Sequence, residues 1–180
     1  MRQRRHDLEH AGLALALIAL SCPAAADDGY RKLFGQASGS LPEADQKAVY
    51  AAMDLAASPD GAGFMFKDMG CPAFVFDDVT AKDLNGDGQP EVILLGGNTC
   101  TSGGNGSSLW LLTKSADGAW QTHLGFTAGA YTLLAETSQG FPDIRVGGMG
   151  WCEGVWRWDG KTYQHLRNVA TQPGGCDQRP

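Results

Sequence analysis

The feature that most constrains this chain is a series of short apolar segments separated by turn residues, which starts near residue 73. Each segment is rich in β-branched and aromatic residues, and clusters of Gly, Asn and Asp lie between them. Such segments are typical of β-strands. They occupy residues 73–76, 91–95, 108–112, 120–126, 131–136, 142–148, 155–158 and 162–167. The pattern predicts a mainly β domain built from antiparallel sheets.

Two of the turns carry a stronger signal and form a faint repeat. Asp117-Gly118 and Asp159-Gly160 are dipeptides that favour tight hairpin turns, and the second lies 42 residues after the first. Each turn follows a strand that contains Trp and precedes a strand that contains Gln, His and Leu in that order. Propeller blades repeat at roughly 40–45 residues, although two copies are too few for a closed ring. The sequence therefore leaves a sandwich and an incomplete propeller-like fold open.

One N-terminal helix is expected before the strands. Ser40 and Glu43 have the spacing of a capping box, and the turn sequence at 58–61 ends a helical pattern. We therefore expect a helix over 41–57 that covers one face or edge of a sheet. Residues 27–39 are expected to form a loose arm.

The first 26 residues have the layout of a secretory signal peptide. A basic start, a ten-residue apolar core and a small-residue exit follow one another in 1–26. Removal of this segment leaves one disulfide-linked domain over 27–180, in a periplasmic or secreted location. Cys22 opens an alternative, since a cysteine at the end of a signal sequence can carry a lipid, but the residues before it match that pattern poorly.

Charge and hydropathy narrow the class of partner. The chain has 14 Lys and Arg against 20 Asp and Glu, with a formal net charge of −6. It contains no basic stripe, which disfavours a nucleic acid partner. The apolar core of the leader is shorter than the roughly 20 residues that span a bilayer, and no later segment is more apolar, so no transmembrane segment is expected.

Four cysteines remain after the leader, and an even number in an exported chain predicts two disulfides. The cysteines are Cys71, Cys100, Cys152 and Cys176. Cys71 and Cys100 lie almost symmetrically about residues 83–91, so a hairpin of the flanking strands would bring them together. We therefore favour the pairs Cys71–Cys100 and Cys152–Cys176.

The sequence DLNGDGQPE, at 83–91, is the one motif with a specific chemistry. Side-chain oxygens recur at Asp83, Asn85, Asp87 and Glu91, and the backbone carbonyl of Gln89 adds another oxygen. Ca²⁺ prefers six to eight hard oxygen ligands. Three acids so close together also repel one another unless a cation neutralises them. These residues are therefore predicted to bind one Ca²⁺ ion.

The loop is not that of an EF-hand, because its twelfth position is Leu94 where an EF-hand requires a bidentate carboxylate. It resembles the calcium loops of integrin-like repeats, the FG-GAP or VCBS repeats, in which D-x-N-x-D-G-x-x-D/E lies between two strands. The resemblance implies a structural Ca²⁺ and a β-propeller context. The chain departs from the family because it carries only one such loop.

We expect a binding or inhibitor protein rather than an enzyme. The overall layout loosely resembles small periplasmic calcium-binding proteins that inhibit lysozymes or confer immunity against peptidoglycan hydrolases. That resemblance implies a protein partner such as a cell-wall hydrolase. The loops 96–108 and 147–154 are the candidate contact segments, since loops on a rigid sheet often form binding surfaces.

Two other functions are alternatives. A carbohydrate- or cell-wall-binding module would use exposed rings of Trp151, Trp156 and Trp158, and buried rings would weaken that hypothesis. A metal-dependent hydrolase ranks last, because a loop that gives its oxygens to Ca²⁺ leaves no open catalytic position. His123 and His165 occupy matching places in the repeat, which predicts a structural role for both, and we predict no catalytic residues.

Overall fold

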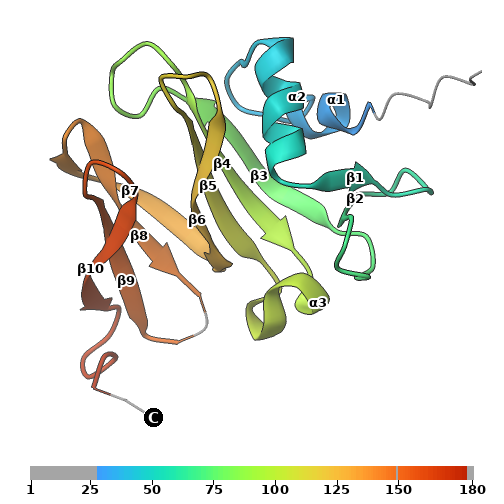
Figure 1. The fold of residues 1–180 in the computed structure, drawn as a ribbon. Coiled ribbons are helices and arrows are strands. Elements are labelled where there is room, and N and C mark those ends of the chain that lie inside the picture. The colour runs from blue at the N-terminus through green and yellow to red at the C-terminus, as the bar shows by residue number, and fades with distance from the viewer. Residues whose placement is uncertain (1–27, 149, 178–180) are drawn as a thin grey trace, which may run out of the picture.

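The computed structural model describes residues 28–148 and 150–177. The expected signal peptide and Cys22 lie outside the described residues. Two four-stranded antiparallel sheets form most of the structure (Figure 1). The first contains β3 (Val75–Lys82), β4 (Glu91–Gly97), β5 (Ser108–Lys114) and β6 (Trp120–Thr127). The second contains β7 (Ala130–Ser138), β8 (Phe141–Gly147), β9 (Cys152–Trp158) and β10 (Tyr163–Ala170).

Each sheet is a simple meander, in which every strand pairs with the next strand in the chain. A four-stranded meander is the unit of a propeller blade. The two sheets stack face to face in Figure 1. The mainly β, antiparallel fold is therefore as expected, and Asp117-Gly118 and Asp159-Gly160 do lie in the turns that join the last two strands of each sheet.

The first sheet is the middle layer of the molecule. Successive side chains of a strand point to opposite faces, and β4 buries both faces. Val92 and Leu94 pack against the N-terminal elements, whereas Ile93 packs against the second sheet. All three side chains are at most 2% exposed, which explains why β4 is a continuous apolar run.

The N-terminal elements cover the other face of the first sheet (Figure 1). They are α1 (Gly29–Phe34), α2 (Glu43–Ala52), β1 (Leu55–Ala57) and β2 (Phe64–Phe66). Two short helical turns, α3 (Thr99–Ser102) and η1 (Gly103–Asn105), lie in the connection between β4 and β5. No helix in the described part of the chain is long and apolar enough to cross a membrane.

The expected helix over 41–57 was too long at both ends. Its N-cap is Pro42, and no side chain caps it. The carboxylate of Glu43 instead accepts a hydrogen bond from the Tyr30 hydroxyl at 2.6 Å. The chain leaves the helix after Ala52, and Leu55, which is fully buried, starts a strand. Pairing with β2 and burial in the core therefore override the helical propensity of this segment.

The loose arm expected over 27–39 was also wrong, because it contains α1. Tyr30 and Leu33 of this helix are buried, at 4% and 0% exposure. Their partners lie in the core with α2 and β1, too far along the chain for a local pattern to indicate.

Seven of the eight expected strands coincide with strands of the structure to within a few residues. The exception is 73–76, because β3 begins at Val75 and continues to Lys82. Asp77 and Asp78 interrupt the apolar pattern there, and a bulge lies at the same place in the pairing with β4. The strand is nevertheless formed, since it is an edge strand and its polar side chains stay accessible.

Candidate functional site

The strand directions place the expected functional segments at two opposite ends of the sheet stack. One end holds the loop 83–91 and the turns that follow β5, β7 and β9. We call it the carboxylate end. The other end holds both disulfides and the loops 96–108 and 147–154. We call it the disulfide end.

The side-chain oxygens of the loop 83–91 turn inward, toward the backbone of the loop. The carboxylate of Asp83 accepts hydrogen bonds from the backbone N–H groups of Gly86, at 2.7 Å, and Gly88, at 2.9 Å. These bonds lower the pKa of Asp83. Both glycines have positive φ angles, of 81° and 85°, so the tight loop depends on residues without a side chain.

The next two expected ligands make the same kind of contact. Asn85 Oδ1 accepts from the backbone of Asp87 at 2.9 Å, and Asp87 Oδ1 accepts from the backbone of Gln89 at 2.7 Å. Asp83, Asn85 and Asp87 are therefore held within one turn of chain. An ionised carboxylate has about four acceptor positions, so these contacts leave capacity for a cation.

Glu91 differs from the other expected ligands because it is buried. Its side chain lies at the start of β4 with only 3% of the residue exposed, and its Oε2 accepts from the backbone of Leu84 at 2.7 Å. Burial, and then the charges of Asp87 and Asp83, raise the pKa of Glu91 to about 7. A buried acid beside two others is an environment that a cation would stabilise.

The oxygen donors of the loop 83–91 are of the kind that binds Ca²⁺, and calcium binding stays a prediction. Among residues 28–148 and 150–177, no group of three or more His, Cys, Asp or Glu side chains is arranged to hold a metal as it stands. The expected set has only three acids, and Asn85 and Gln89 would add an amide and a carbonyl oxygen. Such oxygen donors suit Ca²⁺ rather than a transition metal.

The loop also contacts the second sheet. Gly140, in the turn between β7 and β8, lies so close that an added Cβ would be 3.0 Å from the carbonyl oxygen of Asn85. The next turn approaches from the same side, since a Cβ on Gly160 would be 2.9 Å from the side chain of Gln139. The carboxylate end is therefore a joint between the two sheets.

A pocket of about 490 Å³ opens at this joint. Asp87 and Glu91 line one part of it, and Phe141 and Trp158 contribute aromatic surface. The remaining lining side chains are polar or basic; they are Asn85, Thr113, Lys114, Ser115, Gln121, His123 and Lys161. Sequence reasoning missed this pocket, because the residues come from both sheets and no local pattern connects them.

The disulfide end contains two covalent links. Cys71 pairs with Cys100 and Cys152 with Cys176, at Cα–Cα distances of 5.8 Å and 4.7 Å. This is the pairing that the hairpin argument favoured, and β3 and β4 are the two strands of that hairpin.

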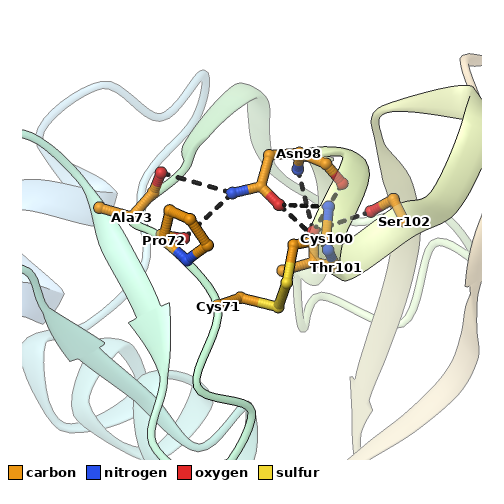
Figure 2. Close-up of a disulfide and its surroundings, with 7 residues drawn as sticks. All are labelled: Cys71, Pro72, Ala73, Asn98, Cys100, Thr101 and Ser102. Atoms are coloured by element: carbon orange, nitrogen blue, oxygen red, sulfur yellow. Dashed lines mark hydrogen bonds between the residues drawn. A yellow bond between two sulfur atoms is a disulfide. The ribbon is translucent and has the colours of Figure 1, made fainter.

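The loop 96–108 is rich in glycine, but hydrogen bonds and a disulfide hold its first part in place. Asn98 caps α3, because its Oδ1 accepts from the backbone N–H groups of Cys100, at 2.9 Å, and Thr101, at 3.0 Å. Its Nδ2 donates to the carbonyl of Pro72 at 3.0 Å, beside the disulfide Cys71–Cys100 (Figure 2). One side chain and one disulfide thus attach the start of this loop to the segment before β3.

The two candidate contact loops meet at this end. A Cβ on Gly148 would be 3.1 Å from the side chain of Asn105, and a small cavity of about 230 Å³ is lined by residues of both loops. Trp151 projects nearby with 58% of its surface exposed. The backbone carbonyl of Trp151 accepts from Thr171 at 2.8 Å, so this loop is also attached to the chain that follows β10.

The remaining tryptophans of the expected cluster are part of the core. Trp158 is 9% exposed and belongs to the core between the sheets, with Trp156 packed against it. His123 lies 4.9 Å from Trp158, and His165 lies 5.6 Å from Trp156, measured between ring centroids. The two histidines therefore occupy matching structural positions, as expected.

His123 also accepts or donates a hydrogen bond at 2.8 Å, between its Nε2 and the hydroxyl of Thr113. Burial lowers the pKa of His123, and the nearby charge of Asp159 opposes that effect.

Comparisons of the chain with protein-family models, with curated proteins and with solved structures found no match.

Proposed function

We propose that this chain is an exported, calcium-binding β-domain that acts as a binding or inhibitor protein in the periplasm, with a cell-wall hydrolase as its class of partner. The observation that carries the proposal is the meeting of the loops 96–108 and 147–154 at the disulfide end, beside exposed Trp151. These loops lie far apart in the sequence, and each is attached close to a disulfide.

Such a surface suits protein recognition for two physical reasons. Loops that are already ordered lose less conformational entropy when they bind. Trp is also among the residues that contribute most to binding energy at protein interfaces. Two loops that are each attached by a disulfide, with one projecting Trp beside them, therefore suit an inhibitory surface.

The compartment is supported by the disulfides. Two disulfides indicate an oxidising, exported location. The expected signal peptide would likewise direct the protein to the periplasm or to secretion.

The calcium site is supported by the environment of Glu91. A carboxylate that is buried beside two other acids is stabilised by a cation, and the carbonyl and carboxylate oxygens of the loop 83–91 are the donors that Ca²⁺ prefers. Bound Ca²⁺ would have a structural role, since it would hold the shape of the loop that packs against Gly140 of the second sheet.

The structure supports the two alternative functions, a glycan-binding module and a metal-dependent hydrolase, to different degrees. A glycan-binding face built from the flat rings of Trp156 and Trp158 is weakened, because Trp158 is buried in the core and Trp156 is partly buried against it. A metal-dependent hydrolase gains one observation, the pocket beside Asp87 and Glu91, and still lacks an assigned nucleophile.

The proposal is tested by measuring whether the purified domain inhibits peptidoglycan hydrolases in a cell-wall lysis assay. The expected result is stoichiometric inhibition of one class of hydrolase. Trp151→Ala should weaken inhibition by about thirtyfold or more, since a Trp at the centre of an interface contributes about 2 kcal/mol or more.

Leu166→Ala is the matched control, because Leu166 is also exposed, at 41%, but lies on β10. It should leave inhibition unchanged. Absence of inhibition and of binding across lysozymes, amidases and lytic transglycosylases would overturn the proposal, as would full inhibition by Trp151→Ala.

A further inference from the structure

The pocket at the carboxylate end is separate from the loops that carry the proposed function. It lies at the opposite end of the strands, and its volume of about 490 Å³ falls in the range of small-molecule sites. Both sheets contribute to it, β5 and β6 from the first and β8 and β9 from the second. Its walls are therefore rigid strands and the tight turns between them.

The pocket is lined by groups of both charges. Asp87 and Glu91 oppose Lys114 and Lys161. Lys114 is itself paired, because its Nζ lies 2.7 Å from a carboxylate oxygen of Asp45. A strongly anionic or strongly cationic ligand would therefore meet a like charge in either orientation.

Hydrogen-bonding groups are nevertheless abundant. Gln121 is an exposed residue of β6 that lines the pocket, and a Gln amide offers two donors and an acceptor. Lys161 adds three donors. A purely apolar ligand would cover these groups and leave them unpaired, which is costly.

The base of the pocket is aromatic. Phe141 and Trp158 both line it and pack against each other, with ring centroids 4.5 Å apart. Apolar surface with a few converging polar groups is the usual composition of a ligand site. A pyranose ring offers matching chemistry, since its hydroxyl groups donate and accept while its C–H faces are apolar.

We propose that this pocket binds a neutral sugar unit, with Gln121 and Lys161 contacting its hydroxyl groups and the edges of Phe141 and Trp158 contacting its C–H face. The site is independent of the proposed inhibitory loops, and Gln121 and Lys161 are not among the predicted calcium ligands. A sugar site on the same domain would keep the protein bound to glycan chains.

The experiment is an NMR titration of the whole folded domain with neutral trisaccharides, namely cellotriose, maltotriose and chitotriose, in calcium and again in EDTA. At millimolar ligand, at least one trisaccharide should shift the indole N–H signal of Trp158 and the ring signals of His123. The signal of Trp151, at the other end, should stay in place.

Gln121→Ala and Lys161→Ala should each weaken binding by about tenfold, the effect of losing one or two hydrogen bonds in a small site. Gln164→Ala and Lys67→Ala are matched controls, since both are exposed and lie outside the pocket, and they should bind as the parent does. All four substitutions are on the surface, so folding is expected to be intact.

Absence of shifts with all three trisaccharides, or shifts that persist in Gln121→Ala and Lys161→Ala, would overturn the sugar site. Neither result bears on hydrolase inhibition, because inhibition is assigned to the disulfide end. If the parent protein binds the sugar but shows no calcium binding, only the calcium prediction is overturned.

Discussion

The two ends of the sheet stack are held together in different ways. At the disulfide end, Cys71–Cys100 and Cys152–Cys176 attach the loops covalently. At the carboxylate end, backbone hydrogen bonds and three close acids shape the loop 83–91. The first end should therefore be insensitive to ions and pH but sensitive to reduction, whereas the second should show the reverse.

The largest effect should follow removal of a disulfide. Replacing both Cys71 and Cys100 by Ala releases a loop with a sequence separation of 29 residues. Loss of that cross-link should lower the free energy of unfolding by about 3–4 kcal/mol, chiefly because the unfolded chain gains entropy. Urea denaturation of the variant and the parent measures the difference.

The Cys152→Ala, Cys176→Ala double variant is the control for position, since its separation of 24 residues is similar. A loss below about 1 kcal/mol for both pairs would show that the disulfide end is held mainly by non-covalent packing.

Calcium should have the next largest effect, at the opposite end. If the dissociation constant lies near 10⁻⁴ to 10⁻³ M, as in many extracellular modules, about 10 mM Ca²⁺ should stabilise the EDTA-treated protein by roughly 1.4–2.7 kcal/mol. Calorimetry should show one site, and thermal unfolding should show a higher Tm. Asp87→Ala should abolish both results.

Asp117→Ala is the matched control for that measurement, because Asp117 is an exposed acid in a turn at the same end. The calcium prediction is contradicted if the parent protein shows no heat and no change of Tm at millimolar Ca²⁺.

A smaller effect is expected at the helix caps, because Asn98 caps α3 whereas Ser40, which was expected to cap the N-terminal helix, does not. Asn98→Ala removes two hydrogen bonds to the first turn of α3 and should cost about 1 kcal/mol. Ser40→Ala should change stability by less than about 0.5 kcal/mol, because Ser40 does not cap α2. Chemical denaturation of both variants provides the comparison, and equal losses would contradict it.

The smallest expected effect is a pH dependence at the carboxylate end. Since burial lowers the pKa of His123 in the folded protein, the unfolded chain takes up a proton first as the pH falls below about 6.5. The contribution of His123 to the free energy of unfolding should therefore decrease from that pH downward and level off below the folded pKa.

His123→Gln should remove this part of the pH slope, as measured by urea denaturation between neutral and mildly acidic pH. An unchanged slope in the variant would assign the effect to other groups.

Local chemistry by itself determined the strands, the tight turns and the cysteine pairing. The period of two in a strand and the preference of Asp-Gly for hairpin turns act over a few residues, so they can be recognised before any fold is known. The same holds for Cys71 and Cys100, because one hairpin brings them together. The oxygen pattern of the loop 83–91 also belongs to this class, although the ion that it predicts is untested.

Tertiary structure decided the rest, because it depends on contacts between distant segments. The segment 55–57 forms a strand because Leu55 is buried in the core. Burial of Tyr30 likewise stabilises a helix where only a loose arm was expected. The burial of Glu91, the meeting of the two contact loops and the pocket at the carboxylate end all require both sheets to be stacked. Burial and packing are properties of that stack, and no short stretch of sequence contains them.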